Sequence, residues 1–210
     1  MSTTLVHSGT GTTLSWTPTI GNLLVVAATA LAYTSLSITD NYGNTWHSSV
    51  SKEDPSGNSF NQFWYCTVTT TGASMTLSSG GHLSYAHVSE WSGSPMPGGS
   101  VITTESTSGT GTAQSITTLA PGSAPGALLL CMYESYTSGT WSGLSSGWTH
   151  LTSNNAYSYT AYQIAGSPTT YAGSITYSAS AQWASLAIAF GWVTPTAPTL
   201  HLLCCLGVGS

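Results

Sequence analysis

The side chains best suited to acid–base chemistry are six carboxylic acids, because a β-sandwich glycosidase needs only two of them about 5–9 Å apart. They are Asp40, Glu53, Asp54, Glu90, Glu105 and Glu134. Glu90 and Glu134 lie within apolar segments that are typical of strands, where burial raises the pKa of a carboxyl group. A carboxyl group at the rim of the sandwich and a hydrogen-bonded structural acid have the same surroundings in sequence, and we favour these interpretations over glycoside hydrolysis.

Three further patterns match catalytic or metal-binding motifs only in part. Residues 143–147 are Gly-Leu-Ser-Ser-Gly, but a nucleophile elbow must lead into a helix, and no helical pattern follows. Residues 49–52, Ser-Val-Ser-Lys, lack the companion elements of a serine β-lactamase. His82 and His87 are five positions apart, so on one strand they point to opposite faces and cannot share a metal. We therefore predict no catalysis, no metal and no cofactor.

Residues 40–44 are Asp-Asn-Tyr-Gly-Asn, which predicts a tight turn because Asn and Gly adopt positive φ easily. A calcium loop is the alternative. Calcium takes about 6–8 oxygen ligands, usually with several carboxylates, and only Asp40 is in range. The turn is therefore the favoured interpretation.

Aromatic residues are abundant, with 8 Trp and 11 Tyr. Large aromatic side chains in small β-domains mostly belong to the core. Exposed rings can instead stack on sugar rings, and three tyrosines near a loop rich in Ser and Asn are the candidates for such a platform: Tyr157, Tyr159 and Tyr162. Cell-surface glycans are therefore a candidate class of partner.

Charged residues make up only 3% of the 210-residue chain, and Lys52 is its single basic residue, whereas ordinary globular domains carry about 25% charged residues. Nucleic-acid binding is excluded, since its affinity comes largely from Lys and Arg at phosphates. Attraction to anionic membranes needs similar basic clusters. The longest apolar run, 23–32, is about half of the roughly 20 residues that a spanning helix needs, so we expect no membrane insertion.

Runs of alternating apolar and polar residues, bounded by Gly, Asn, Ser and Pro, recur along the chain without any helical stripe. The sequence therefore predicts an all-β protein, an antiparallel β-sandwich of jelly-roll-like type. A first series of strands is expected near 3–7, 12–16, 22–32, 35–40, 45–51, 61–69, 73–78 and 82–91. A second series is expected near 101–105, 113–119, 127–136, 147–152, 157–164, 173–178 and 182–193.

The two series of strands look like copies, which predicts two pseudo-repeated sandwich halves at 1–93 and 94–193. Gly-Asn-Leu-Leu-Val-Val at 21–26, for example, is matched by Gly-Ala-Leu-Leu-Leu-Cys at 126–131. Other matches follow in the same order, with a spacing that drifts only slightly. The pattern leaves open whether the halves form two sandwiches or interleave in one jelly roll.

The cysteines divide into two kinds. Cys66 and Cys131 stand alone in apolar runs, so we expect buried thiols. Residues 194–210 form a Pro-containing linker and an apolar tail, which should be covered by its own domain or by a neighbouring subunit. The residues expected at such a contact are Leu200, Leu202, Leu203, Cys204, Cys205 and Leu206. Any disulfide of the two adjacent cysteines is expected to join another chain.

Three segments carry a resemblance: the buried run 21–26, the turn and Trp at 38–46, and Glu-Trp-Ser-Gly at 90–93. They resemble Ser/Thr/Gly-rich β-sandwich proteins of bacteriophage virions and of bacterial surface filaments. The resemblance implies a structural or adhesive role, as a capsid decoration protein, a tail or fibre component, or a filament subunit. It implies no catalytic residues.

A nearly uncharged surface points the same way, because little repulsion keeps copies of such a chain apart. Residues 1–7 have neither the basic nor the apolar region of a secretory signal. We therefore expect a virion structural protein, assembled in the host cytoplasm and contacting copies of itself and other virion proteins. The alternatives are an extracellular adhesin or glycan-binding module, a secreted filament subunit and, less favoured, a glycoside hydrolase.

Overall fold

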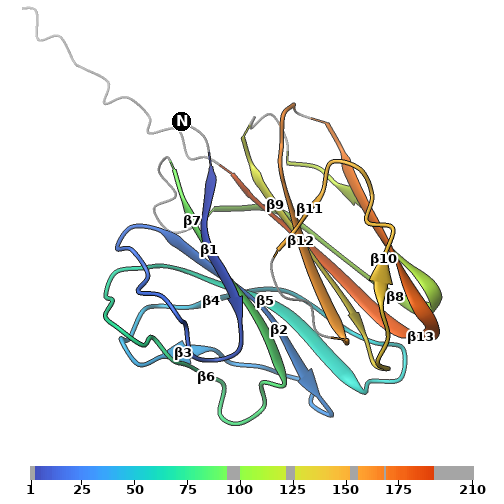
Figure 1. Cartoon of the computed structure of the whole chain (residues 1–210), viewed down its shortest axis with the longest axis horizontal. Coiled ribbons are helices and arrows are strands. Elements are labelled where there is room, and N and C mark those ends of the chain that lie inside the picture. Colours follow the sequence, from blue (N-terminus) through green and yellow to red (C-terminus); the bar gives the residue numbers. More distant parts are fainter. Residues whose placement is uncertain (1–2, 94–99, 122–125, 152–155, 168, 192–210) are drawn as a thin grey trace, which may run out of the picture.

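The computed structural model describes residues 3–93, 100–121, 126–151, 156–167 and 169–191, and these residues form strands, turns and loops but no helix. Two antiparallel sheets pack face to face (Figure 1). The predicted all-β sandwich is confirmed. The apolar C-terminal residues expected at a subunit contact lie outside the described residues.

Thirteen strands make up the described part of the chain. They are β1 (Thr4–Thr10), β2 (Leu23–Leu31), β3 (Thr39–Asp40), β4 (His47–Glu53), β5 (Ser59–Thr67), β6 (Leu77–Ser78), β7 (Tyr85–Ser92), β8 (Ser100–Leu119), β9 (Leu128–Ser135), β10 (Trp141–Ser142), β11 (Thr149–His150), β12 (Ser158–Ile164) and β13 (Tyr171–Gly191).

The two sheets have the same strand order. The first is β1-β7-β2-β5-β4, and the second is β8-β13-β9-β12-β11, with the short β10 paired to the beginning of β13. Each of these sheets contains strands of one half of the chain only, so the halves do not interleave within a sheet. The jelly-roll description stays a prediction.

Both faces of each sheet are covered, which explains the continuous apolar runs of β2 and β9. Alternate residues of β2 face two different cores: Leu24 and Val26 pack under the loops and β3–β6 of their own half, whereas Leu23 and Val25 face the second sheet. Leu128 and Leu130 of β9 meet them from the other side. The molecule therefore has a central core between the sheets and an outer core on each side.

Two aromatic pairs cross the central core at equivalent positions. Trp91 of β7 meets Tyr162 of β12 with ring centroids 5.0 Å apart, and Phe190 of β13 meets Tyr65 of β5 at 5.2 Å. Trp91 and Phe190 both pair with the first residue of the neighbouring strand, β2 or β9. Each half thus presents the same kind of surface to the other, as the subunits of an isologous dimer do.

A repeat that the sequence analysis missed marks the two edge strands. Residues 8–12 and 108–112 are both Ser-Gly-Thr-Gly-Thr. In each copy the second glycine has positive φ, 95° at Gly11 and 136° at Gly111, and the first glycine lies under an indole, Trp16 over Gly9 and Trp183 over Gly109. Glycine is needed at the bends because other residues rarely adopt positive φ.

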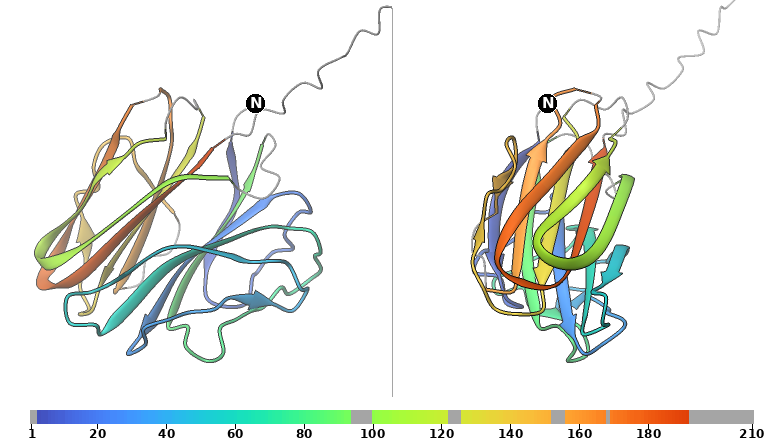
Figure 2. Two further views of the ribbon diagram at one scale, coloured as in Figure 1. Left: turned by 180° about the vertical axis from the view of Figure 1, so that it is seen from behind. Right: turned by 90° about the vertical axis from the view of Figure 1, so that its right-hand side faces the viewer.

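The longest antiparallel strand pair, β8 with β13, corrects four of the expected strands. The ranges 101–105 and 113–119 belong to one strand, β8, and 173–178 and 182–193 are replaced by one strand, β13. The expected strands left residues 106–112 unassigned, but the ladder only shifts its register there and continues. The two strands run side by side along their length (Figure 2).

Candidate functional site

The best candidate site is a cluster of polar side chains buried between the sheets, beyond the end of the central apolar core. On β9 the inward-facing residues are Leu128, Leu130, Met132 and then Glu134. Because alternate residues share a face, the carboxyl group continues the apolar row into the space between the sheets. The other members of the buried polar cluster are Thr29, Ser59, Asn61, His87 and Ser158, and none of the six is more than 4% exposed.

Glu134 is held by β5 of the other sheet. Its Oε2 accepts hydrogen bonds from Ser59 Oγ at 2.7 Å and from Asn61 Nδ2 at 3.3 Å. Its Oε1 has no hydrogen-bond partner among the described residues. Burial raises the pKa of Glu134 to about 7, although both hydrogen bonds favour the charged form. The group therefore titrates near neutral pH.

His87 and Ser158 form the second contact between the sheets. His87 Nε2 lies 2.5 Å from Ser158 Oγ, and Ser158 stands opposite Glu134 in the β9–β12 ladder. Burial, with a smaller effect of the charge on His150, lowers the pKa of His87 to about 4, so its ring is neutral at pH 7. A Ser–His pair can form a nucleophile, but these side chains are at most 4% exposed and no substrate can reach them.

Asp54 extends the polar network into the β4–β5 turn. Its carboxylate accepts hydrogen bonds from Ser56 N at 2.8 Å, Asn58 N at 3.1 Å and Ser59 Oγ at 3.2 Å. Ser56 Oγ in turn contacts Gln182 of β13. The network therefore fixes the turn and joins the two halves, as a structural network does.

Glu90 has a different role from Glu134. It lies on the face of β7 that points to the outer core, and its Oε1 accepts hydrogen bonds from Thr19 N at 2.8 Å and Asn22 Nδ2 at 2.7 Å. It is fully buried and fixes the turn that leads into β2. The two acids considered for glycoside hydrolysis therefore face different layers of the molecule.

Asp40 is surrounded by N–H donors. Its carboxylate accepts hydrogen bonds from Tyr42 N at 2.7 Å, Asn44 Nδ2 at 3.1 Å and Trp46 Nε1 at 2.7 Å. These donors occupy the oxygens that a cation would need. The described residues contain no group of three or more His, Cys, Asp or Glu side chains placed to hold a metal ion.

The three tyrosines considered as a glycan platform do not share one face. Tyr159 is 8% exposed in the outer core and stacks on His150, with ring centroids 4.5 Å apart. Tyr162 lies on the opposite face of β12, against Trp91. Tyr157 stacks on Tyr85 at 5.4 Å. Alternation along one strand already implies this for Tyr159 and Tyr162, because an odd separation of three positions puts them on opposite faces.

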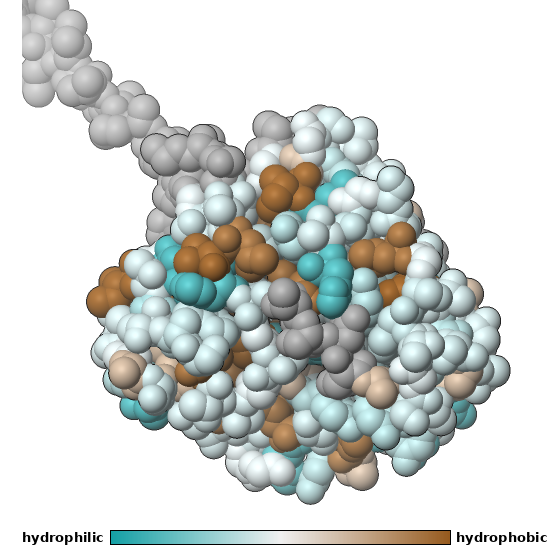
Figure 3. Space-filling view, viewed as in Figure 1, coloured by the Kyte–Doolittle hydropathy of each residue, from teal (hydrophilic) through white to brown (hydrophobic). Residues whose placement is uncertain are grey.

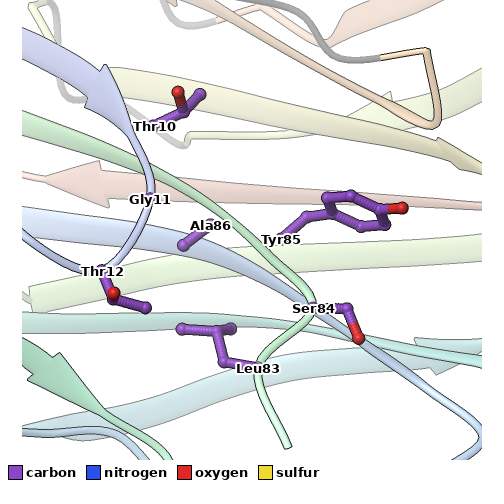
Figure 4. Close-up of a pocket in the computed structure, with 7 residues that line it drawn as sticks. All are labelled: Thr10, Gly11, Thr12, Leu83, Ser84, Tyr85 and Ala86. Atoms are coloured by element: carbon purple, nitrogen blue, oxygen red, sulfur yellow. The ribbon is translucent and has the colours of Figure 1, made fainter.

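A groove of about 260 Å³ opens beside the bend at Gly11. It is lined by Thr10, Gly11, Thr12, Leu83, Ser84, Tyr85 and Ala86. Figure 4 shows the side chains of Thr12 and Leu83 pointing toward each other, whereas the ring of Tyr85 points the other way. No aromatic platform faces the groove, so glycan binding stays a prediction.

Cys66 and Cys131 are free and buried, as expected. Burial raises the pKa of both thiols, so neither is a reactive thiolate at neutral pH.

Comparisons of the chain with protein-family models, with curated proteins and with solved structures find no match. The described residues also include no helix long and apolar enough to cross a membrane.

Proposed function

We propose that the chain is a non-catalytic structural subunit of an extracellular assembly, namely a virion, in which neighbouring subunits pair through the open edge of β8. The observation that carries this proposal is the length of that edge. β8 has 20 residues, and β13 is its only ladder partner among the described strands. The other edge of β8 presents backbone N–H and C=O groups that can pair with another strand.

The composition of β8 supports the proposal. Natural proteins protect exposed strand edges with lysine, other charges or proline. Across Ser100–Leu119 the one charged residue is Glu105, and there is no proline. The edge strand β4 at the far side of the first sheet carries two charges, Lys52 and Glu53, in only seven residues. β8 is thus a long edge with little protection against pairing.

The outer surface also suits close packing of copies. The face in Figure 3 is mostly of intermediate hydropathy, with separate apolar patches and few strongly hydrophilic ones. On β8 itself, Ile102 is 39% exposed. Few charges have to be desolvated or brought together when such surfaces meet.

Lysine substitution at the β8 edge tests the proposal. Thr104 and Thr110 are exposed on β8, and Thr34 and Ser37 are exposed in a loop. The unaltered protein should form oligomers or filaments at micromolar concentration, measured by mass photometry and electron microscopy. T104K/T110K should shift it to monomers, whereas the control T34K/S37K, with the same added charge, should still assemble. A stable monomer of the unaltered protein, or assembly that survives T104K/T110K, would contradict the proposal.

A further inference from the structure

The only lysine of the chain stands beside a buried amide. Lys52 of β4 is directly opposite Asn61 of β5 in the antiparallel ladder, so the two side chains share the face that points to the second sheet. Asn61 Nδ2 also lies 3.4 Å from the backbone carbonyl oxygen of Lys52. Directly opposite Cβ atoms are about 5 Å apart, and the four-carbon stem of lysine can bring Nζ to the carboxamide across that distance.

The surroundings of Asn61 are those of an activated amide. Its side chain is fully buried, so water is excluded. Its Oδ1 accepts a hydrogen bond from Thr29 Oγ1 at 2.7 Å, which polarises the carbonyl. Its Nδ2 donates to Glu134 Oε2 at 3.3 Å, which places a carboxyl group beside the nitrogen that would leave.

We propose that Lys52 Nζ and Asn61 Cγ join in an intramolecular isopeptide bond, with Glu134 as the acid–base group. The proposal gives a role to three polar side chains, from β2, β5 and β9, that meet within the buried polar cluster. The pKa of Glu134, about 7, lets the group both give and take a proton near neutral pH. The Lys52 ammonium has no hydrogen-bond or ion-pair partner among the described residues, Asn61 and Glu134 included, so its side chain must turn toward Asn61 before the bond can form.

The reaction needs no oxidant or further reactant. Lys52 Nζ first loses its ammonium proton to water. The amine then attacks Asn61 Cγ, and Thr29 Oγ1 donates a hydrogen bond to the oxyanion that forms on Oδ1. Glu134 gives a proton to Nδ2, the Cγ–Nδ2 bond breaks and ammonia leaves. The Glu134 carboxylate then takes the excess proton from the Lys52 nitrogen. An amine and a carboxamide thus become one secondary amide and ammonia.

The cross-link would fasten the edge strand β4 to β5. The two buried cysteines are free thiols, so no disulfide supplies this function in the described part of the chain. A covalent staple at a sheet edge restricts the unfolded chain and resists fraying of that strand.

Trypsin and intact mass together test the proposal, because Lys52 is the only residue in the chain after which trypsin can cut. The purified full-length protein should have a mass lower than its sequence by about 17 Da, the mass of one ammonia lost in the transfer to lysine. After denaturation it should resist trypsin. K52R should regain the full mass and be cut at position 52, which controls for the neighbouring acidic residues.

Further variants separate the roles. E134Q keeps the size and the burial of the side chain but cannot supply the proton, so it should have the full mass and be cut at Lys52. S35K, an exposed loop variant, should be cut at position 35 while position 52 stays resistant. A full mass for the unaltered protein would overturn the proposal. A loss of ammonia that persists in K52R would overturn it as well, because it would have to come from another amide.

Discussion

The two halves of the molecule share a strand order but differ at their outer edge. In the first half, β1 pairs with β7 as far as Thr10. Beyond the bend at Gly11 the chain leaves β7, and Thr13 forms a single bridge with Thr76. In the second half, β8 pairs with β13 on both sides of the bend at Gly111, the counterpart of Gly11, with a shift of register there. The same position in the fold therefore holds a short edge in one half and a long edge in the other.

The length of one connection explains the difference. In the first half, residues 77–84 separate Thr76 from β7, and the groove beside Gly11 opens there. In the second half, only residues 177–180 separate the two paired parts of β13. A longer corner loop interrupts an edge, whereas a short one leaves the backbone aligned for pairing. The proposed assembly edge thus depends on the length of a corner loop as well as on the strands themselves.

The halves also differ in the polar part of their interface. By the strand registers, Glu134 of the second half occupies the position of Thr29 in the first, and Ser158 that of Asn61. One half thus supplies the carboxyl group and the other supplies the amide that it contacts. The central aromatic pairs are alike in the two halves, but the buried polar cluster is built from unlike residues.

Truncation of the central aromatic residues should have the largest effect on the free energy of unfolding, and it tests whether the two aromatic pairs are equivalent. Trp91 and Phe190 are 2% and 1% exposed, and truncation of a buried Trp or Phe costs about 3–5 kcal/mol. W91A and F190A should each lower the free energy of unfolding by that amount in urea titrations. Y33A, which truncates a ring that is 42% exposed, should change it little. A loss in only one of the two core variants would show that the halves are not equivalent in packing.

The second largest effect is the pH dependence of the free energy of unfolding that Glu134 and His87 of the polar cluster produce. The folded state holds a proton on Glu134 up to a pKa of about 7, so this group lowers stability as pH rises from about 4.5 to 7. The folded state keeps His87 neutral down to about pH 4, so this group lowers stability as pH falls from about 6.5 to 4. Each effect amounts to about 3 kcal/mol, and they oppose each other where they overlap.

Single variants should separate the two titrations. The melting temperature of the unaltered protein should change little between pH 4.5 and 6.5. H87Q should become less stable as pH rises through this range, because only Glu134 then titrates. E134Q should become less stable as pH falls, because only His87 then titrates. Parallel curves for the three proteins would contradict the assignment of these groups.

The sequence predicted what depends on local pattern. Alternation and apolar runs predicted an all-β chain, and the apolar run around Glu134 left a rim position and a hydrogen-bonded structural acid as the favoured interpretations, of which the structure has the second. The identical segments 8–12 and 108–112 were a visible signal of the repeated edge strands that was missed. By contrast, the partners of Glu134 come from β5 of the other sheet, 73–75 positions away. Packing between sheets is not encoded by any local period, so this contact could not be predicted.

The smallest expected effect concerns the two glycine bends. A Cβ added at Gly11 or Gly111 meets no atom within 4 Å, so the cost of alanine there is conformational and comes from the positive φ. G11A and G111A should each lower the free energy of unfolding by about 1–2 kcal/mol. Gly166 also has open space around its Cβ position but lacks a positive φ, so G166A should have little effect. If G111A is the more costly of the two, the long β8–β13 ladder depends on its bend more than the short edge does. Equal costs would place the difference between the halves in the corner loops alone.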